Sequence, residues 1–312
     1  MAQLNYLFKR LLQMIPVLFF VTVLIFTMIR LIPGDPARTL LGEMALEEDV
    51  QRLRELMGLN KPYTTQYFIW MKGILTGDLG RSLVYKMPVK DMILPRLRIT
   101  VGLTFLSMIF AVILSFPLGY MAGKHKDKFG DQFIRVTALA AISMPTFWVG
   151  LLLMILFGVK LHWFPVGGWA ETPAEQFKAL VLPALTSCLM TTALLMRNLR
   201  NSVVDISILD YVDFARSKGI TETRVSTMHI LRNALITTVT LLMMRMAWML
   251  GGSVVIETVF SLPGMGKLMI DSIFGRDYAV VQVLVLAFSM LVIVMNLITD
   301  ILYSFLDPRV AL

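Results

Sequence analysis

Six apolar blocks, each about as long as a membrane-spanning helix, limit what this chain can fold into. They occupy residues 11–32, 100–123, 136–159, 179–196, 234–259 and 281–303. A helix needs about 20 residues to cross a hydrocarbon layer about 30 Å thick. The chain is 57% hydrophobic and only 16% charged, whereas about 25% of the residues of soluble domains are charged. The blocks therefore predict an all-α integral membrane protein with six transmembrane helices.

The basic residues of the loops predict the orientation. Segment 124–135 carries four Lys or Arg and segment 197–233 carries six, whereas 160–178 and 260–280 carry two each, balanced by acids. Short basic loops remain on the cytoplasmic side of a membrane. We therefore expect both termini inside, Lys126 in an inner loop, and Ser82 accessible from outside.

This orientation divides the chain into four parts. The outer segment contains "ALEEDVQRLRELMGL", in which Leu46, Val50, Leu53 and Leu56/Met57 have helical spacing. It predicts a small helical extracytoplasmic subdomain after the first span. The parts are the N-terminal cytoplasmic end with the first span (1–32), the outer subdomain (33–98), a core of five spans (99–304) and a cytoplasmic tail (305–312).

Four prolines fall within or at the edges of the apolar blocks: Pro16, Pro117, Pro145 and Pro183. Inside lipid, a proline leaves a backbone carbonyl that neighbouring groups must satisfy. These positions are therefore candidates for bends in the helix bundle.

The polar residues form no pattern typical of catalysis, nucleotide binding or metal binding. "GMGKL" at 264–268 lacks the earlier glycine and the following Ser or Thr of a phosphate-binding loop. The three histidines lie in different loops, and the one cysteine, Cys188, lies inside an apolar block. We expect no enzyme activity and no cofactor bound by this chain. The net charge of +8 would suggest nucleic acid in a soluble chain, but its distribution over the loops of a membrane protein argues against this, so we expect no nucleic-acid partner.

The segment between the fourth and fifth blocks is polar yet has a helical pattern. Ile208, Tyr211/Val212 and Ala215 fall on one face of a short helix, and Gly219 follows where a left-handed C-cap is expected. Thr221 then begins a second short helix. Two interpretations remain open on the pattern alone: an amphipathic loop resting on lipid, and a docking element for a soluble partner.

The spacing of Ala215, Gly219 and Leu231 resembles the cytoplasmic EAA loop of ABC-importer permeases. The segment "DYVDFARSKG…HILRNAL" is similar to the form of this loop in the peptide/nickel permease family, although Phe214 replaces the middle alanine. Further segments resemble landmarks of that family in the same order along the chain. They are "IPGDPAR" (32–38), "GLNKPYTTQY" (58–67), "GDLGRSL" (77–83), "SMPTFW" (143–148), "LGGSVVIETVFSLPGMGKL" (250–268), "RDYAVVQ" (276–282) and "DPR" (307–309).

The resemblance implies a type I ABC-importer permease fold in a bacterial or archaeal plasma membrane. It implies a second, homologous permease subunit, two cytosolic ATPase subunits that bind ATP and Mg, an extracytoplasmic substrate-binding protein, and membrane lipid around the spans. The substrate would be a di- or oligopeptide, or alternatively nickel or a metal chelate. A stand-alone secondary transporter is a further alternative, for which only Glu257 and Asp300 are candidate buried acids.

The resemblance also implies that the loop 197–233 couples this chain to the ATPase. The residues implied are Asp210, Tyr211, Asp213, Ala215, Arg216, Lys218, Gly219, His229 and Arg232. Tyr211 and Ala215 are expected to pack in a groove of the ATPase, with Arg216 and Lys218 facing acids at its rim. Separately, Arg245 lies inside the fifth apolar block, where a cation is costly. We expect it to face the translocation cavity and attract substrate carboxylates, with a structural ion pair as the alternative.

Overall fold

The computed structural model describes residues 2–31, 35–42, 44–82 and 84–306. Within these ranges the ordered structure is helical, and the one β-type contact is an isolated bridge between Arg81 and Pro88. The tail landmark "DPR" and residues 32–34 of "IPGDPAR" lie outside the described residues. The helices form two compact units, residues 3–99 with 264–293 and residues 100–263 with 294 onward.

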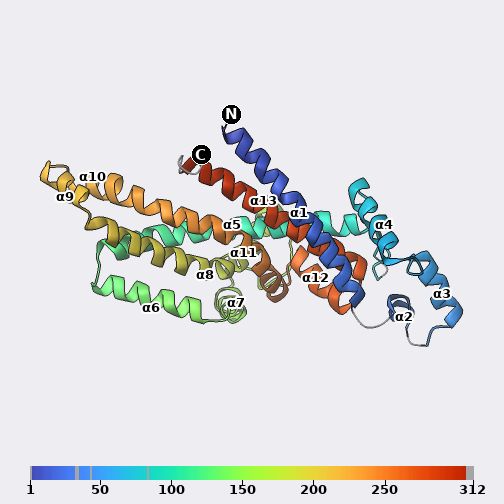
Figure 1. Ribbon diagram of the computed structural model, residues 1–312. Coiled ribbons are helices and arrows are strands. Elements are labelled where there is room, and N and C mark those ends of the chain that lie inside the picture. Colours follow the sequence, from blue (N-terminus) through green and yellow to red (C-terminus); the bar gives the residue numbers. More distant parts are fainter. Residues whose placement is uncertain (1, 32–34, 43, 83, 307–312) are drawn as a thin grey trace. The chain divides into compact units, whose positions relative to one another are not determined.

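Five helices are long and apolar enough to cross a membrane, and a bent pair of helices makes the sixth candidate (Figure 1). A helix satisfies its own backbone hydrogen bonds, as hydrocarbon requires. The predicted all-α membrane fold is thereby confirmed, and the six predicted spans correspond to five long helices and the bent pair. The five are α1 (Ala2–Leu31), α5 (Val89–Lys124), α8 (Pro173–Ser207), α11 (Arg232–Val259) and α13 (Tyr278–Leu306).

The third predicted span is wrong as a single helix over 136–159. The chain instead forms α6 (Phe129–Ser143) and then α7 (Thr146–Leu153), which continues into a π-helix, η1 (Met154–Lys160). The two parts are bent by 108°. Met144 is extended, with φ −87° and ψ 135°, because the ring of Pro145 disfavours a helical conformation of the residue before it. Hydropathy does not report this break, since the residues on both sides of it are apolar.

The fourth span is much longer than the 18-residue block that hydropathy indicated. It begins at a Thr172 N-cap, whose Oγ1 accepts a hydrogen bond from the Glu175 N–H, with Pro173 in the first turn. It then continues past Arg197 and Arg200 to Ser207. A helix that extends beyond the lipid takes polar residues there, so an apolar window underestimates its length.

The predicted outer segment contains three helices, α2 (Pro36–Leu41), α3 (Glu47–Leu56) and α4 (Tyr63–Thr76). The helix expected from the leucine spacing is present as α3, but only Val50 of its apolar positions is fully buried. The Nη2 and Nε of Arg30, at the end of α1, donate to the Oε1 of Gln66 on α4 at 2.8 and 3.2 Å. Gln66 in turn donates to the carbonyl of Lys61 at 2.7 Å. This polar link ties the first span to the outer helices.

The core of the first unit joins the start of α5 to α12 (Met265–Phe274) and α13. The side chains that meet there are buried and apolar. They are Val89, Met92, Ile93, Met265, Leu268, Val280, Val283 and Leu284. A buried hydrogen bond from Ser82 to the carboxylate of Asp277 lies in the same unit.

In the second unit, α5 packs against α8 through two glycines one helical turn apart. A Cβ on Gly119 would lie 2.8 Å from the Met196 carbonyl oxygen, and one on Gly123 would lie 2.7 Å from the Cβ of Val203. The two glycines form a G-x-x-x-G pattern, which lets helix backbones approach closely in membranes. Because Gly119 and Gly123 have no side chains, α5 can lie this close to α8.

Replacing Gly123 should destabilise the protein. The Cβ of Gly123→Ala meets a β-branched side chain and a backbone carbonyl, and such overpacking costs about 1–3 kcal/mol. The measurement is the unfolding temperature of the detergent-purified protein. Gly102→Ala on the same helix is the matched control, because its Cβ lies 3.7 Å from Leu180 in ordinary contact. Equal unfolding temperatures for the two variants would contradict a close α5–α8 contact.

Ser82 is not accessible as the sequence led us to expect. Its side chain is 1% exposed, donates to Asp277 and accepts from the Tyr85 N–H. A cysteine at this position would resist labelling from either side. Met44, in the same predicted outer segment, is fully exposed, and the native Cys188 is buried.

The predicted orientation can be tested with Met44→Cys and Lys126→Cys. In intact cells a membrane-impermeant maleimide should label the first variant, and should label the second only after permeabilisation, because short basic loops remain inside. The native protein provides the background control. Labelling of Lys126→Cys but not Met44→Cys in intact cells would reverse the topology.

Candidate functional site

A helical hairpin connects α8 to α11 and contains the residues singled out in the sequence. Its first helix is α9 (Asp210–Ser217), and its second begins with α10 (Glu222–Arg224) and the π-helix η2 (Val225–Leu231). The turn at Gly219 and the start after Thr221 are confirmed. The second helix is not short, however, since it continues without a break from Glu222 to Val259. The hairpin therefore opens directly into the fifth span.

Gly219 terminates α9 in the left-handed conformation, with φ +75°. Its N–H donates to the Arg216 carbonyl at 2.9 Å, and the N–H of Ile220 reaches the Ala215 carbonyl at 3.4 Å. This pair of hydrogen bonds is the Schellman motif, which satisfies the last carbonyls of a helix. Nothing lies within 4 Å of a Cβ built on Gly219. The glycine is therefore needed for its backbone conformation, since there is room for a side chain.

The inner face of α9 is buried against the two long helices that the hairpin joins. Val212 and Ala215 are 0% and 5% exposed. They pack with residues of α8, η2 and α11, namely Leu199, Val203, Val225, Ile230 and Ala234. Ala215 thus contacts this chain's own core, so the expectation that it enters a groove of another protein is wrong for this residue. The burial fastens α9 to both neighbouring spans.

Polar contacts reinforce the hairpin at both ends of α9. The Tyr211 hydroxyl donates to the His229 carbonyl at 3.0 Å and accepts from the Asn233 amide at 3.0 Å. Arg216 donates to Asp213 at 3.0 Å and to both oxygens of Glu222 at 3.3 Å, so it bridges the two helices across Gly219. Hydrogen bonding to Glu222 is the largest cause of the raised pKa of Arg216, so the guanidinium stays charged. These ion pairs are exposed and contribute little stability by themselves.

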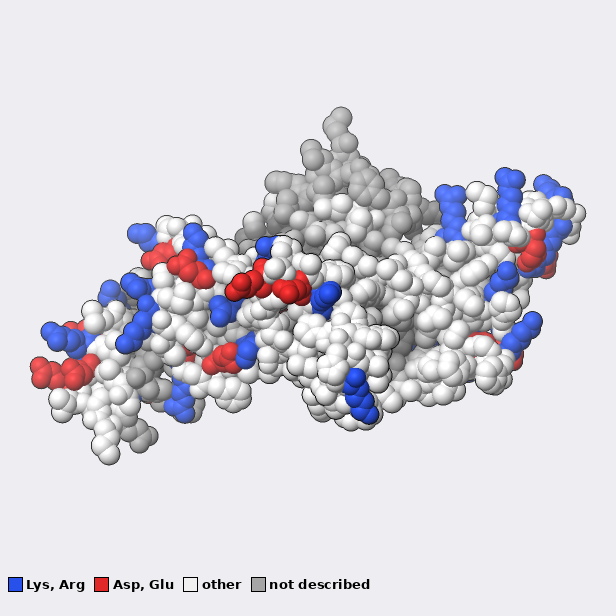
Figure 2. Space-filling view, turned by 180° about the vertical axis from the view of Figure 1, so that it is seen from behind, with Lys and Arg blue, Asp and Glu red and all other residues white. Residues whose placement is uncertain are grey.

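The outer face of the hairpin exposes large apolar side chains next to charged ones. Ile208, Phe214 and Met228 are 75%, 61% and 52% exposed. The Lys218 ammonium lies 4.5 Å from the centroid of the Phe214 ring. Asp210 and Arg232 are also exposed. On the face shown in Figure 2, Lys and Arg side chains gather at the end of the second unit that carries α9 and α10.

Arg245 lies well away from the hairpin along the chain, inside α11, and is half-buried. Within the described ranges it forms no ion pair. Glu257 further along α11 is buried and accepts a hydrogen bond from Thr100 at 2.7 Å. Met244 and Trp248, close to Arg245 along α11, belong to a stripe of exposed residues on that helix. The stripe continues to Gly251, Gly252 and Val255. The role expected for Arg245 stays a prediction.

Sequence reasoning missed an ion pair that fastens the loop 124–135, which is predicted to lie inside. Arg200 of α8 donates from Nε and Nη2 to the two carboxylate oxygens of Asp131 on α6, at 3.1 and 2.6 Å. Asp131 is fully buried and also accepts from the Asp127 N–H at 2.9 Å. In the sequence these residues count only as charges of two polar loops, because 69 positions separate them.

The residues that the structure describes contain no group of three or more His, Cys, Asp or Glu placed to hold a metal ion. In "GMGKL", Gly264 is the N-cap of α12, and the Lys267 ammonium lies 3.4 Å from Asp271 one turn later.

Comparison with known proteins covers nearly the whole chain. Residues 115–312 match the family described as "Binding-protein-dependent transport system inner membrane component", and residues 3–104 match its N-terminal companion. The chain is 39% identical over 307 residues to the "Glutathione transport system permease protein GsiC" of Escherichia coli strain K12. The proteins of that name in Shigella dysenteriae and Salmonella paratyphi A are equally similar, with 98% of this chain and 99% of each relative covered.

A solved structure shares the fold over much of the chain. It is described as "Crystal structure of an amino acid ABC transporter with histidines" and aligns with a TM-score of 0.53 at 15% identity. The alignment covers 69% of this chain and 94% of that one.

Proposed function

We propose that this chain, which belongs to the family of binding-protein-dependent transport system inner membrane components, forms half of the translocation pathway of an ATP-driven importer. Its family membership along nearly the whole chain identifies it as an ABC-importer permease. The observation that supports the finer proposal is the hairpin, whose inner face is buried against two spans while its outer face is apolar and charged.

The partners proposed are a second homologous permease, two ATPase subunits that bind ATP and Mg, and an extracytoplasmic substrate-binding protein. The outer face of the hairpin supports the ATPase contact, because Phe214, Ile208 and Met228 are exposed beside Lys218 and Arg232. Aromatic residues, Phe among them, are enriched in protein–protein interfaces, whose rims are polar. Phe214 thereby takes the docking role that the sequence assigned to Ala215.

The proposed mechanism is mechanical transmission through the hairpin. Because α9 is packed on both α8 and the start of the α11 helix, a displacement of α9 must move those helices or break the buried cluster. Packed cores have discrete arrangements and are not continuously deformable. Closure of the ATPases on ATP would thus re-orient the spans and alternate access to a central cavity between two permeases. The exposed stripe on α11 is the surface proposed to line this cavity.

The proposed substrate is a small peptide. The relatives are named for transport of glutathione, a tripeptide. Arg245 lies on α11 beside the exposed stripe, where a cation would attract substrate carboxylates. Import of nickel or a metal chelate is the alternative within the same architecture. A stand-alone secondary transporter is a weaker alternative, since it would leave the exposed apolar face of the hairpin without a partner.

Replacing Gly219 with valine should uncouple ATP hydrolysis from transport. Valine in the left-handed region costs about 1–2 kcal/mol, so the Schellman turn would be lost and α9 would be displaced. The measurement is binding of the ATPase subunits and substrate-stimulated ATP hydrolysis in reconstituted vesicles. Coupling should fall severalfold while the membrane domain remains folded.

Gly219→Asn is the matched control, because asparagine tolerates the left-handed conformation and no atom obstructs a Cβ there. It should retain most of the coupling. Unchanged ATPase binding and hydrolysis in Gly219→Val would return the hairpin to a loop resting on lipid. Equal loss in both variants would show that a partner surface approaches Gly219 itself.

Arg245→Gln should reduce uptake of an anionic peptide more than Arg245→Lys does, because only the glutamine variant removes the charge. The measurement is uptake of labelled glutathione, a labelled dipeptide and labelled nickel in a strain lacking the native system. The loss should be about tenfold for glutathione, corresponding to one charge-assisted contact of about 1.4 kcal/mol. Full glutathione uptake in a properly assembled Arg245→Gln complex would exclude this role, and uptake of nickel alone would select the metal alternative.

A further inference from the structure

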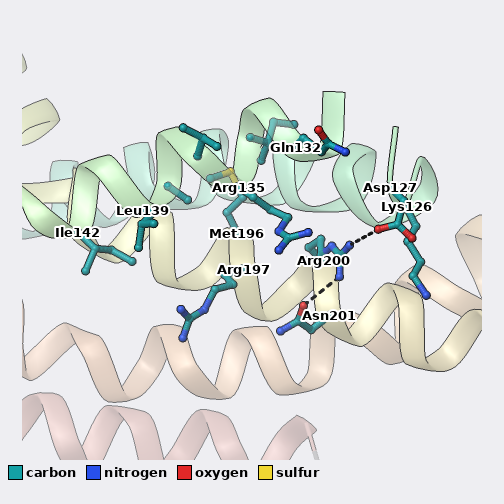
Figure 3. A pocket seen from close by; sticks show the side chains of 13 residues that line it. Lys126, Asp127, Gln132, Arg135, Leu139, Ile142, Met196, Arg197, Arg200 and Asn201 are labelled. Atoms are coloured by element: carbon teal, nitrogen blue, oxygen red, sulfur yellow. Dashed lines mark hydrogen bonds and ion pairs between the residues drawn. The ribbon is translucent and has the colours of Figure 1, made fainter. Parts of the chain in front are cut away.

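A cleft of about 790 Å³ lies between α6 and α8, on the second unit. It runs from the inner loop at Lys126 and Asp127 to Ile142, which precedes the bend at Pro145. Figure 3 shows its two walls, with Arg135 on α6 and Arg197 on α8. Nothing in the proposed transport cycle uses these side chains.

The loop end of the cleft is strongly basic. Four Lys or Arg side chains line it (Lys126, Arg135, Arg197 and Arg200), against one lining carboxylate, Asp127. Arg200 is held by its bidentate contact with Asp131. Across the part of the chain that the structure describes, neither Arg135 nor Arg197 forms an ion pair. Both are exposed, so the cleft presents two guanidinium groups outside any salt bridge, and the buried Asp131 carboxylate acts on Arg135 only through space.

The other end of the cleft is apolar. Leu139 and Ile142 follow Arg135 at helical spacing along α6, and Met196 forms the floor on α8. From Arg135 to Ile142 the wall extends for about 10 Å at 1.5 Å per residue. Val136 and Leu139 are 66% and 62% exposed, so the apolar wall continues onto the open face of α6.

We infer that this cleft binds one anionic glycerophospholipid, with its phosphate between Arg135 and Arg197 and an acyl chain along Leu139 and Ile142. Planar guanidinium groups match phosphate oxygens in pairs, and basic clefts at the inner ends of spans recognise anionic headgroups. The inference rests on the predicted inner location of loop 124–135 and is independent of the transported substrate. A peptide or a nucleotide would leave the apolar wall uncovered, whereas a lipid occupies both ends.

The site also has a preformed frame. The Arg200–Asp131 pair joins α6 to α8, the two helices that carry Arg135 and Arg197. Arg200 also lies within 3.4 Å of the Asn201 amide oxygen. A lipid bound here would bridge α6 and α8 and stabilise the α6–α8 pair, of which α8 also packs against α5.

The test is titration of the purified full-length protein with dioleoylphosphatidylglycerol, with binding followed by native mass spectrometry. Each of Arg135→Gln and Arg197→Gln should weaken binding about fivefold, and the double variant about twentyfold, from a contribution of roughly one charge contact per arginine. Arg135→Lys with Arg197→Lys should retain most of the affinity, which separates loss of charge from misfolding. Lys178→Gln, at the far end of α8, is the matched control and should bind as the native protein does.

Three probes identify the ligand. Dioleoylphosphatidylcholine should bind at least tenfold more weakly than the anionic lipid, and glycerol 3-phosphate at equal concentration should not displace it. Unchanged phosphatidylglycerol binding in the double glutamine variant would overturn the inference. Displacement by glycerol 3-phosphate would identify a site for soluble anions, and displacement by glutathione would place the cleft on the transport route; either result would also overturn it.

Discussion

Every peptide group of a span must find its hydrogen-bond partner within the protein, because hydrocarbon offers none. The chain meets this requirement with helices, and its architecture follows from how those helices approach one another. The apolar surfaces of helices in lipid gain little from mutual burial, so close packing carries the association. Gly119 and Gly123 allow α5 to contact the backbone of α8.

At Pro145 the helix does not continue, and the chain turns by 108° between α6 and α7. Small residues and one proline thus position the long helices on which the hairpin and the α6–α8 cleft are built.

The hairpin combines a fixed inner face with a free outer face. Val212 and Ala215 are buried against α8 and the helix that continues into α11, while Phe214 between them points outward. The alternation follows from helical geometry, because residues one and two positions apart lie on different faces. Gly219 closes the turn without sterically crowding any neighbour. Such a structure can transmit force, since the element proposed to receive a partner shares one core with two spans. The hydrogen bonds of Arg216 to Asp213 and Glu222 help to set the angle between the two helices and contribute little stability.

The same polar end of the bundle carries a second, distinct feature. The Arg200–Asp131 pair draws two charges of adjacent elements together at the base of the cleft and leaves Arg135 and Arg197 exposed above it. A fully buried carboxylate with a bidentate arginine and a backbone donor is satisfied, so it can serve as a permanent link between α6 and α8. The positive-inside rule only counts the charged residues of a loop. The structure shows that some of them form buried ion pairs while others are accessible.

The sequence by itself determined the membrane class, the approximate spans and the glycine turn of the hairpin, because hydropathy, loop charge and a helix C-cap are local properties. It also contained the family landmarks along nearly the whole chain. The bend after Ser143 was visible only as a proline, since nothing local tells whether neighbours will accommodate it in a helix, as they do Pro16 and Pro183. Which hairpin residues face inward, the burial of Ser82 against Asp277, and the pairing of Arg200 with Asp131 were decided by tertiary structure alone. Each joins residues remote in sequence, and a side chain's partner across such a distance depends on how whole helices pack.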